Sequence, residues 1–283
     1  MFELKRDLNS LPLTWVGHCA YFLSSYKKRS NAKKNIDFIF QPSLSPAEKK
    51  CLCVAYYSHI TTNIKEIILF ALVSKKSLEK CIKVIGIEHL ENALGKGKGI
   101  LVFTGHFGNW EFAPLFFLDK FNSKDLDFYC VRKNLRFAFL DSIFLRQFEN
   151  CGFKIISHKN AVSQIRRALK SNAIVFFPFD VCPSSKIKNK IKTDFLGQKT
   201  ETNLSLAYLA SLYDSCVLSI SFYRTNKKQH VVHIYPEVKP VVCPDYKQTL
   251  VENTQLYNKR LEEMLLPYPE QWLWSYKRWT NNG

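Results

Sequence analysis

The amino-acid sequence predicts an α/β protein with a mixed, largely parallel central sheet flanked by helices, preceded by a helical N-terminal region. Two observations predict this class. From about residue 82 onward, short apolar runs alternate with amphipathic stretches, and such strand–helix alternation is typical of a sheet covered on both faces. Before residue 80 the residue spacing favours helices. The chain of 283 residues is long enough for one large α/β domain, which we expect over residues 81–283 after a helical region over 1–80.

The N-terminal region is expected to begin with a helix from about residue 8 to 28, followed by a break between Pro42 and Pro46. A second helix is predicted to start at Ser45-Pro46-Ala47-Glu48, because serine is a good N-cap, proline suits the first helical position and an acid suits the first turn.

The apolar run Leu11–Leu23 is shorter than the roughly 20 residues that cross a bilayer. Because a basic cluster follows it directly, the run predicts an interfacial anchor on an anionic membrane surface. Ordinary packing of an N-terminal helix is the alternative. The cluster consists of Lys27, Lys28, Arg29, Lys33 and Lys34.

The α/β domain is predicted from apolar runs bounded by turn residues, with amphipathic stretches between them. The expected strands are Lys83–Gly86, Ile100–Thr104, Leu126–Arg132, Phe153–Ser157, Ile174–Pro178, Val217–Tyr223 and Val231–Tyr235. The expected helices lie near residues 110–121, 136–150, 160–171, 203–213 and 246–265.

Charge and cysteine content limit the classes of partner. With 41 basic and 24 acidic residues the chain carries a net charge of +17, which suits nucleic acid, anionic lipid or an acidic protein. No helix-turn-helix, aromatic RNA-binding motif or zinc finger can be found in the sequence, so we expect no nucleic-acid partner. Nine cysteines without any CxxC pair disfavour a structural zinc site and indicate reduced thiols in a cytoplasmic compartment.

Residues 99–112 contain the most informative motif. An apolar strand is expected to end at Gly105, and a helix to start near Asn109, which is a candidate N-cap and substrate-binding residue. With His106 in the turn and Glu111 in the first helical turn, the two side chains can meet at the edge of the sheet where α/β proteins place their chemistry. A histidine held by a carboxylate can remove a proton from a hydroxyl nucleophile.

The string Gly105–Glu111, Gly-His-Phe-Gly-Asn-Trp-Glu, resembles the active-site motif of the bacterial lipid A biosynthesis late acyltransferases, the lauroyl/myristoyl transferase family. These belong to the wider His-x4-acid acyltransferases. Further stretches similar to the family are Val84–Leu90, Tyr129–Asn134, Phe195–Gly197 with Thr200 and Thr202, and Pro269–Trp274. Together they cover most of residues 84–279.

This resemblance implies an acyltransferase that moves a fatty acyl group from an acyl carrier protein thioester to a hydroxyl of a lipid A precursor or related glycolipid. It implies His106 as general base, Glu111 as its partner, and Arg132 as a cation that binds donor, acceptor or transition state. The implied location is the cytoplasmic face of the bacterial inner membrane. No metal or cofactor is expected, because the imidazole supplies the base.

The chain departs from the family pattern in two places. Where the family commonly has Pro-Asp-Gln, this chain has Pro178-Phe179-Asp180, and Asp180 is expected to bind substrate. The usual N-terminal spanning helix is here short and carries His18, so peripheral or shallow attachment is expected.

Two further segments carry candidate binding residues. In an extended Ser184–Lys192, side chains of Lys186, Lys188 and Lys190 would share one face and suit phosphates or acidic sugars; a solvated edge strand is the alternative. The aromatic C-terminal segment could dock on lipid headgroups or pack in the core. Its large side chains are Trp272, Trp274, Tyr276 and Trp279.

Other functions stay open from the sequence. Glycerol-phosphate acyltransferases share the His-x4-acid arrangement but usually add a Pro-Glu-Gly-Thr strand motif, which Pro178–Val181 does not provide. Another glycolipid could be the acceptor within the same family. A basic membrane-binding protein without enzymatic activity would carry the same charge. A cysteine nucleophile is disfavoured, because no cysteine lies in a recognisable turn beside a paired histidine.

Overall fold

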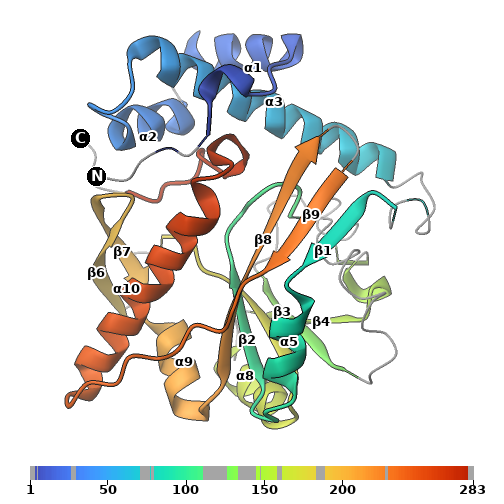
Figure 1. The fold of residues 1–283 in the computed structure, drawn as a ribbon, viewed down its shortest axis with the longest axis vertical. Coiled ribbons are helices and arrows are strands. Elements are labelled where there is room, and N and C mark those ends of the chain that lie inside the picture. Colours follow the sequence, from blue (N-terminus) through green and yellow to red (C-terminus); the bar gives the residue numbers. More distant parts are fainter. Residues whose placement is uncertain are drawn as a thin grey trace.

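A computed structural model describes residues 4, 6–26, 30–70, 77, 80–110, 126–132, 145, 146, 148–157, 161–182, 189–226 and 229–279 (Figure 1). Its helices are η1 (Leu8–Ser10), α1 (Trp15–Tyr26), α2 (Asn31–Ile39), α3 (Pro46–Phe70), α5 (Ile87–Leu94), α8 (Ala161–Lys170), α9 (Ser205–Tyr213), α10 (Tyr246–Leu265) and η2 (Pro269–Gln271). Its strands are β1 (Ile82–Ile85), β2 (Ile100–Thr104), β3 (Phe128–Arg132), β4 (Phe153–Ser157), β5 (Ile174–Pro178), β6 (Lys190–Phe195), β7 (Gln198–Asn203), β8 (Cys216–Asn226) and β9 (Gln229–Ile234).

In the described part of the chain, seven strands form the main sheet in the order β1-β9-β8-β2-β5-β3-β4. Strands β8, β2, β5, β3 and β4 run parallel to one another, β9 runs antiparallel to β8, and β1 pairs parallel with β9. The predicted mixed, largely parallel sheet with flanking helices is therefore confirmed. The strands β6 and β7, which were not among the expected ones, form a separate antiparallel hairpin.

Strand β2 buries side chains on both sides, because helices cover both faces of the sheet. Leu101 and Phe103 pack into a core shared with α8, α9 and α10. Ile100 and Val102 point the other way, into a core shared with α5. A strand buried on both faces reads as the continuous apolar run from which it was predicted.

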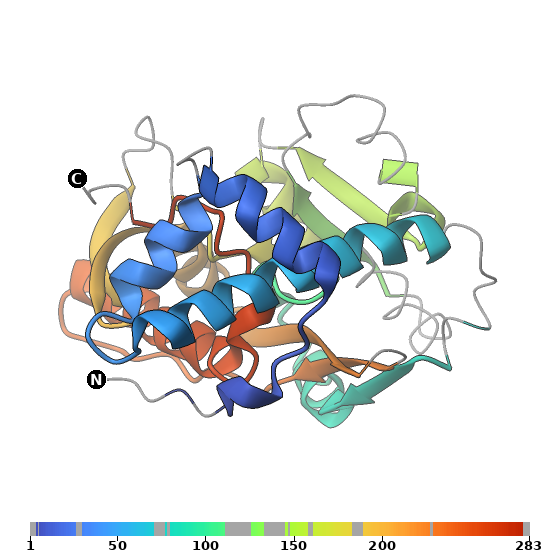
Figure 2. The same cartoon turned by 90° about the horizontal axis from the view of Figure 1, so that it is seen from above.

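The helices α1, α2 and α3 form a layer across one end of the molecule, at the top in Figure 1 and nearest the viewer in Figure 2. Strand β8 points toward this layer, and β2 and β5 run in the same direction as β8, so their carboxyl ends face α3. The helix α1 lies close against α3 at Gly17, where an added Cβ would come within 2.0 Å of Ser58 Oγ. Among the described helices, none combines the length and apolarity needed to cross a membrane.

The expected helix over residues 8–28 is wrong in its extent, because Leu11 breaks it into η1 and α1. Leu11 precedes Pro12, and proline disfavours helical dihedrals in the residue before it. Leu11 is accordingly extended, with φ −65° and ψ 137°. The predicted start of α3 is confirmed: Glu48 Oε2 accepts from the Ser45 N–H at 2.8 Å, and Ser45 Oγ accepts from the Glu48 N–H at 3.3 Å. The expected helix over 110–121 and most of that over 136–150 lie outside the described residues.

Candidate functional site

Two neighbouring strand ends bring His106 and Asp180 together. In the parallel pairing of β2 with β5, Thr104 lies opposite Pro178. His106 and Asp180 each follow two residues after these paired positions, so the two chains leave the sheet side by side. The distance from His106 Nδ1 to Asp180 Oδ1 is 2.8 Å. The carboxylate that contacts the imidazole is thus supplied by the neighbouring strand.

From the described residues, Asp180 accepts three hydrogen bonds. Besides the imidazole, the His106 backbone N–H donates to Oδ2 at 2.7 Å and the Trp272 indole N–H donates to the same oxygen at 2.8 Å. The Asp180 side chain is 3% exposed. Burial raises the pKa of Asp180, but the charge of His106 and these hydrogen bonds outweigh it, so the pKa lies below its ordinary value. Asp180 is therefore ionised at neutral pH.

An ionised carboxylate can only accept hydrogen bonds, which fixes the tautomer of His106. In the neutral imidazole, the proton therefore sits on Nδ1 and the lone pair on Nε2. The imidazole is 24% exposed, in contrast to the buried carboxylate behind it. The Trp110 ring approaches it edge-on at a centroid distance of 5.4 Å, and the Tyr276 ring lies nearly parallel at 6.1 Å. The arrangement can take a proton from a group that reaches Nε2.

The C-terminal segment holds the turn around His106. The Leu273 N–H donates to the His106 carbonyl at 3.1 Å, and the Gly108 N–H donates to the Gln271 carbonyl at 3.0 Å. Gly108 has φ +54°, and a Cβ there would come within 2.4 Å of the Phe222 carbonyl oxygen. Glycine is therefore required at this position. The three tryptophans of the aromatic segment pack in the core, with Trp272 and Trp274 fully buried and Trp279 6% exposed, whereas Tyr276 is 38% exposed.

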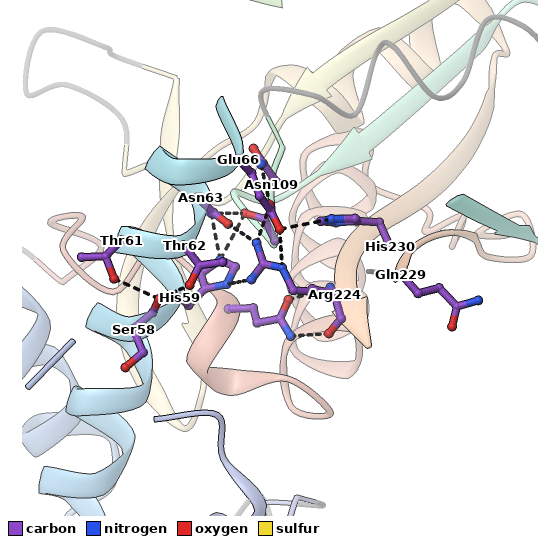
Figure 3. A network of polar contacts seen from close by, with 12 residues as sticks. Ser58, His59, Thr61, Thr62, Asn63, Glu66, Asn109, Arg224, Gln229 and His230 are labelled. Atoms are coloured by element: carbon purple, nitrogen blue, oxygen red, sulfur yellow. Dashed lines mark hydrogen bonds and ion pairs between the residues drawn. The ribbon is translucent and has the colours of Figure 1, made fainter. Parts of the chain in front are cut away.

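A buried polar network joins α3 to the other side of the same turn (Figure 3). At its centre, Arg224 from β8 donates from Nε and Nη2 to both oxygens of Glu66, at 2.9 and 2.6 Å. Asn63 Nδ2 donates to the Gly108 carbonyl at 2.7 Å, and Asn109 Nδ2 donates to Glu66 Oε2 at 2.9 Å. The network therefore holds Gly108 and Asn109, the two residues directly after Phe107, against the N-terminal helical layer.

Burial, neighbouring charges and hydrogen bonds together set the protonation states in this network. Burial and the neighbouring Arg224 charge lower the pKa of His59 to about 3, so this imidazole is neutral. Burial raises the pKa of Glu66, but hydrogen bonds from His230 and Arg224 outweigh it and bring the pKa to about 2. The network thus holds an ionised Glu66–Arg224 pair beside a neutral His59.

The predicted site residues are placed as follows. His106 and Asp180 are in contact, and Asp180, which was expected to bind substrate, is instead buried and bonded to the imidazole. Glu111, Lys186 and Lys188 lie outside the described residues. The Asn109 side chain is 4% exposed and faces Glu66, so it contributes to the buried network. Lys190 Nζ forms an ion pair with Glu201 Oε2 at 2.6 Å across the β6–β7 hairpin.

Arg132 ends β3 at the same edge of the sheet. Cys130 pairs with Phe176 of β5, which places Arg132 level with Pro178 and hence with Thr104. The Arg132 backbone is two strands, or ~10 Å, from that of β2. Its guanidinium lies 5.5 Å from the Phe148 ring centroid.

Sequence reasoning missed several residues that build the site. Trp272 was expected to contact lipid or core, without a link to His106. His59, Asn63 and Glu66 recur along α3 at helical spacing, and a polar stripe on a helix in an apolar setting was the available signal. In the part of the chain that is described, no cluster of three or more histidine, cysteine or acidic side chains is arranged to hold a metal ion.

Comparison with known proteins adds independent information. The family described as bacterial lipid A biosynthesis acyltransferase matches residues 8–281. A lipid A biosynthesis acyltransferase from Haemophilus influenzae is 22% identical over 275 residues, which are 96% of this chain and 80% of that protein. A crystal structure of the 1-acyl-sn-glycerophosphate (LPA) acyltransferase PlsC from Thermotoga maritima aligns with a TM-score of 0.39 and 12% identity, covering 88% of this chain and 95% of that chain.

Proposed function

This chain belongs to the bacterial lipid A biosynthesis acyltransferase family, and from that premise we propose that it moves a fatty acyl group from a thioester donor to a hydroxyl of a lipid A precursor or related glycolipid. The observation that carries the catalytic part is the 2.8 Å contact between His106 Nδ1 and the buried Asp180 at the carboxyl edge of the sheet. His106 acts as general base and Asp180 keeps its imidazole in the required tautomer.

The proposed reaction balances with these two side chains. His106 Nε2 takes the proton of the acceptor hydroxyl while the hydroxyl oxygen attacks the carbonyl carbon of the thioester. The carbon–sulfur bond of the resulting tetrahedral intermediate then breaks, and the imidazolium returns the proton to the leaving thiolate. The products are an ester and a free thiol. Asp180 stabilises the imidazolium between the two steps without taking its proton.

The proposed donor is an acyl carrier protein, because such proteins are acidic and the chain carries a net charge of +17. Arg132 is proposed to bind donor, acceptor or transition state, since it ends a strand at the same edge as the base. Lys186 and Lys188 are proposed to meet phosphate groups of the acceptor. Lys190 is left out of this proposal, because its ion pair with Glu201 holds its side chain on the hairpin. Glu111 stays a predicted site residue.

We further propose that the helical layer docks on an anionic membrane surface. Large apolar side chains are exposed along α1 and at the end of α3, namely Trp15 (77%), Phe22 (69%), Leu23 (62%), Ile64 (54%) and Ile68 (61%). A hollow of about 540 Å³ is lined by Phe22, Leu23 and Lys50, among others. The same helical layer also carries exposed lysines, including Lys34, Lys50 and Lys65. Exposed apolar side chains and lysines in one layer complement an anionic leaflet, and the layer lies at the end of the sheet that holds His106.

Vesicle binding tests this docking. Replacing both Trp15 and Phe22 with serine is expected to lower co-sedimentation with phosphatidylglycerol vesicles by at least ~10-fold, because two large apolar side chains no longer insert. The control is Val242→Ser, which removes an apolar side chain that is 84% exposed in the segment between β9 and α10. Equal binding of the two variants would contradict docking through the helical layer.

An acyl-transfer assay tests the proposed activity. The purified chain is incubated with a long-chain acyl carrier protein thioester and vesicles that contain a lipid A precursor, and the lipids are analysed by mass spectrometry. We expect one added acyl chain, slower transfer from the corresponding acyl-coenzyme A, and unchanged turnover in EDTA. Binding to the vesicles without any added acyl chain would instead favour a non-enzymatic membrane protein, and transfer to glycerol phosphate alone would favour the glycerol-phosphate class.

A further inference from the structure

The indole of Trp272 contacts Asp180, the carboxylate that bonds to His106. Its N–H donates to Asp180 Oδ2 at 2.8 Å, while the other carboxylate oxygen, Oδ1, accepts from His106 Nδ1. The three groups therefore form a continuous chain from a fully buried indole to the partly exposed imidazole. A hydrogen bond that ends on a charged carboxylate is stronger than one between neutral groups.

The surroundings of Trp272 fix the direction of this indole. Its ring makes edge contacts with three aromatic neighbours, at centroid distances of 5.7 Å to Phe195, 4.8 Å to Trp274 and 6.0 Å to Trp279. Its backbone pairs with Phe107, the residue directly after His106. The aromatic neighbours therefore hold the ring in place, and the backbone is held against the turn that carries His106.

The C-terminal segment also carries a buried cation, which shares the neighbour Phe195 with Trp272. Arg278 is fully buried, donates to Thr202 Oγ1 and Asn258 Oδ1 at 3.0 Å each, and lies 4.9 Å over the Phe195 ring. Burial lowers the pKa of Arg278 to about 10, and the negative charge of Asp180 acts in the opposite direction. The C-terminal segment therefore supplies both a hydrogen-bond donor and a positive charge that favour the ionised form of Asp180.

We propose that Trp272 is a positioning residue of the acyl-transfer site, which holds Asp180 ionised and aimed at His106 Nδ1. This inference rests on the proposed function, because it assigns Trp272 a part in the work of the base. Without the indole N–H, Asp180 would accept one hydrogen bond fewer, so its negative charge would be less stabilised. The carboxylate would then attract the Nδ1 proton more strongly. The imidazolium would then be stabilised and the apparent pKa of the base would rise.

The variant Trp272→Phe tests the proposal, since it removes the N–H and keeps an aromatic ring. We expect kcat to fall about 10-fold to 100-fold, because the carboxylate loses the hydrogen bond that aims it at His106 Nδ1 and the imidazole is no longer held in line with the acceptor hydroxyl, while KM for both substrates stays within ~3-fold. We also expect the acidic limb of the kcat/KM profile to move to higher pH by roughly 0.5 to 1 unit.

The chain offers a matched control in Trp274→Phe. Trp274 is equally buried in the same segment, but its indole N–H donates to the Pro269 carbonyl at 2.6 Å and not to Asp180. This variant removes the same atoms and is expected to lose stability without a shift of the acidic limb. A merely structural role of Trp272 would make the two variants alike.

Histidine NMR separates failure of this inference from failure of the proposed function. The titration of His106 in ¹⁵N-histidine protein, assigned by comparison with His106→Gln, is expected to move to higher pH in Trp272→Phe only. An unchanged titration, or an equal shift in Trp274→Phe, would overturn the positioning role. If the wild-type chain transfers no acyl group, the proposed function fails, but the titration still decides whether Trp272 acts on the pair.

Discussion

Replacing Asp180 with asparagine is expected to lower kcat by about 10⁴-fold, and replacing His106 with alanine by at least as much. Asp180 Oδ1 and Oδ2 both accept hydrogen bonds, so an amide nitrogen in place of either oxygen meets an N–H donor. If the asparagine N–H donates to Nδ1, the imidazole adopts the tautomer with its proton on Nε2. That nitrogen can then no longer accept the proton of the acceptor hydroxyl. The measurement is kcat for acyl transfer with both substrates saturating.

Asp194→Asn is the control for this loss, because Asp194 is 54% exposed on the hairpin and pairs with Lys199 at 2.9 Å. Its kcat is expected to match the wild-type value. Glu111→Gln in the same series assigns the carboxylate partner. If Asp180→Asn stays within ~10-fold of wild type while Glu111→Gln loses ~10⁴-fold, the partner of the base is Glu111 and the assignment from the structure is wrong.

Replacing Arg224 with methionine is expected to lower the free energy of unfolding by about 3–5 kcal/mol. The side chains of Arg224 and Glu66 are 10% and 9% exposed, so the substitution leaves a buried carboxylate without its main counter-charge. Urea unfolding followed by tryptophan fluorescence measures the loss. Adding Glu66→Gln to this variant is expected to restore part of the stability, because the stranded charge is removed.

The exposed pair Lys33–Asp37 provides the matched comparison. Its N···O distance is 2.7 Å, close to that of the buried pair, but the side chains are 48% and 42% exposed. Lys33→Met is therefore expected to cost less than ~1 kcal/mol. If Lys33→Met and Arg224→Met lost similar amounts of unfolding free energy, burial would not account for the stabilisation that the Glu66–Arg224 pair provides.

The sequence predicted the strands of the main sheet well, because strands buried on both faces are continuous apolar runs. It could not predict which strands are neighbours. That order decides the site: Asp180 meets His106 only because β5 lies beside β2. A signal was available, since His106 and Asp180 each follow two residues after the end of a predicted strand.

The buried network was harder to predict for the same reason. His59, Asn63 and Glu66 come from α3, whereas Arg224 lies more than 150 residues later on β8. Nothing local in the sequence distinguishes this arginine from those on the surface. The ion pair of Lys190 with Glu201 likewise depends on the register of a hairpin that the sequence pattern did not reveal.

The backbone contacts between the C-terminal segment and the turn at His106 bear on how the protein matures during synthesis. The carbonyl of His106, the proposed base, is held by Leu273, and the carboxylate of Asp180 is held by Trp272, more than 150 residues later in the chain than His106. A nascent chain that has released the helical layer and most of the sheet from the ribosome still lacks these two contacts. The proposed catalytic pair therefore gains these two contacts only after residues 272 and 273 have been synthesised.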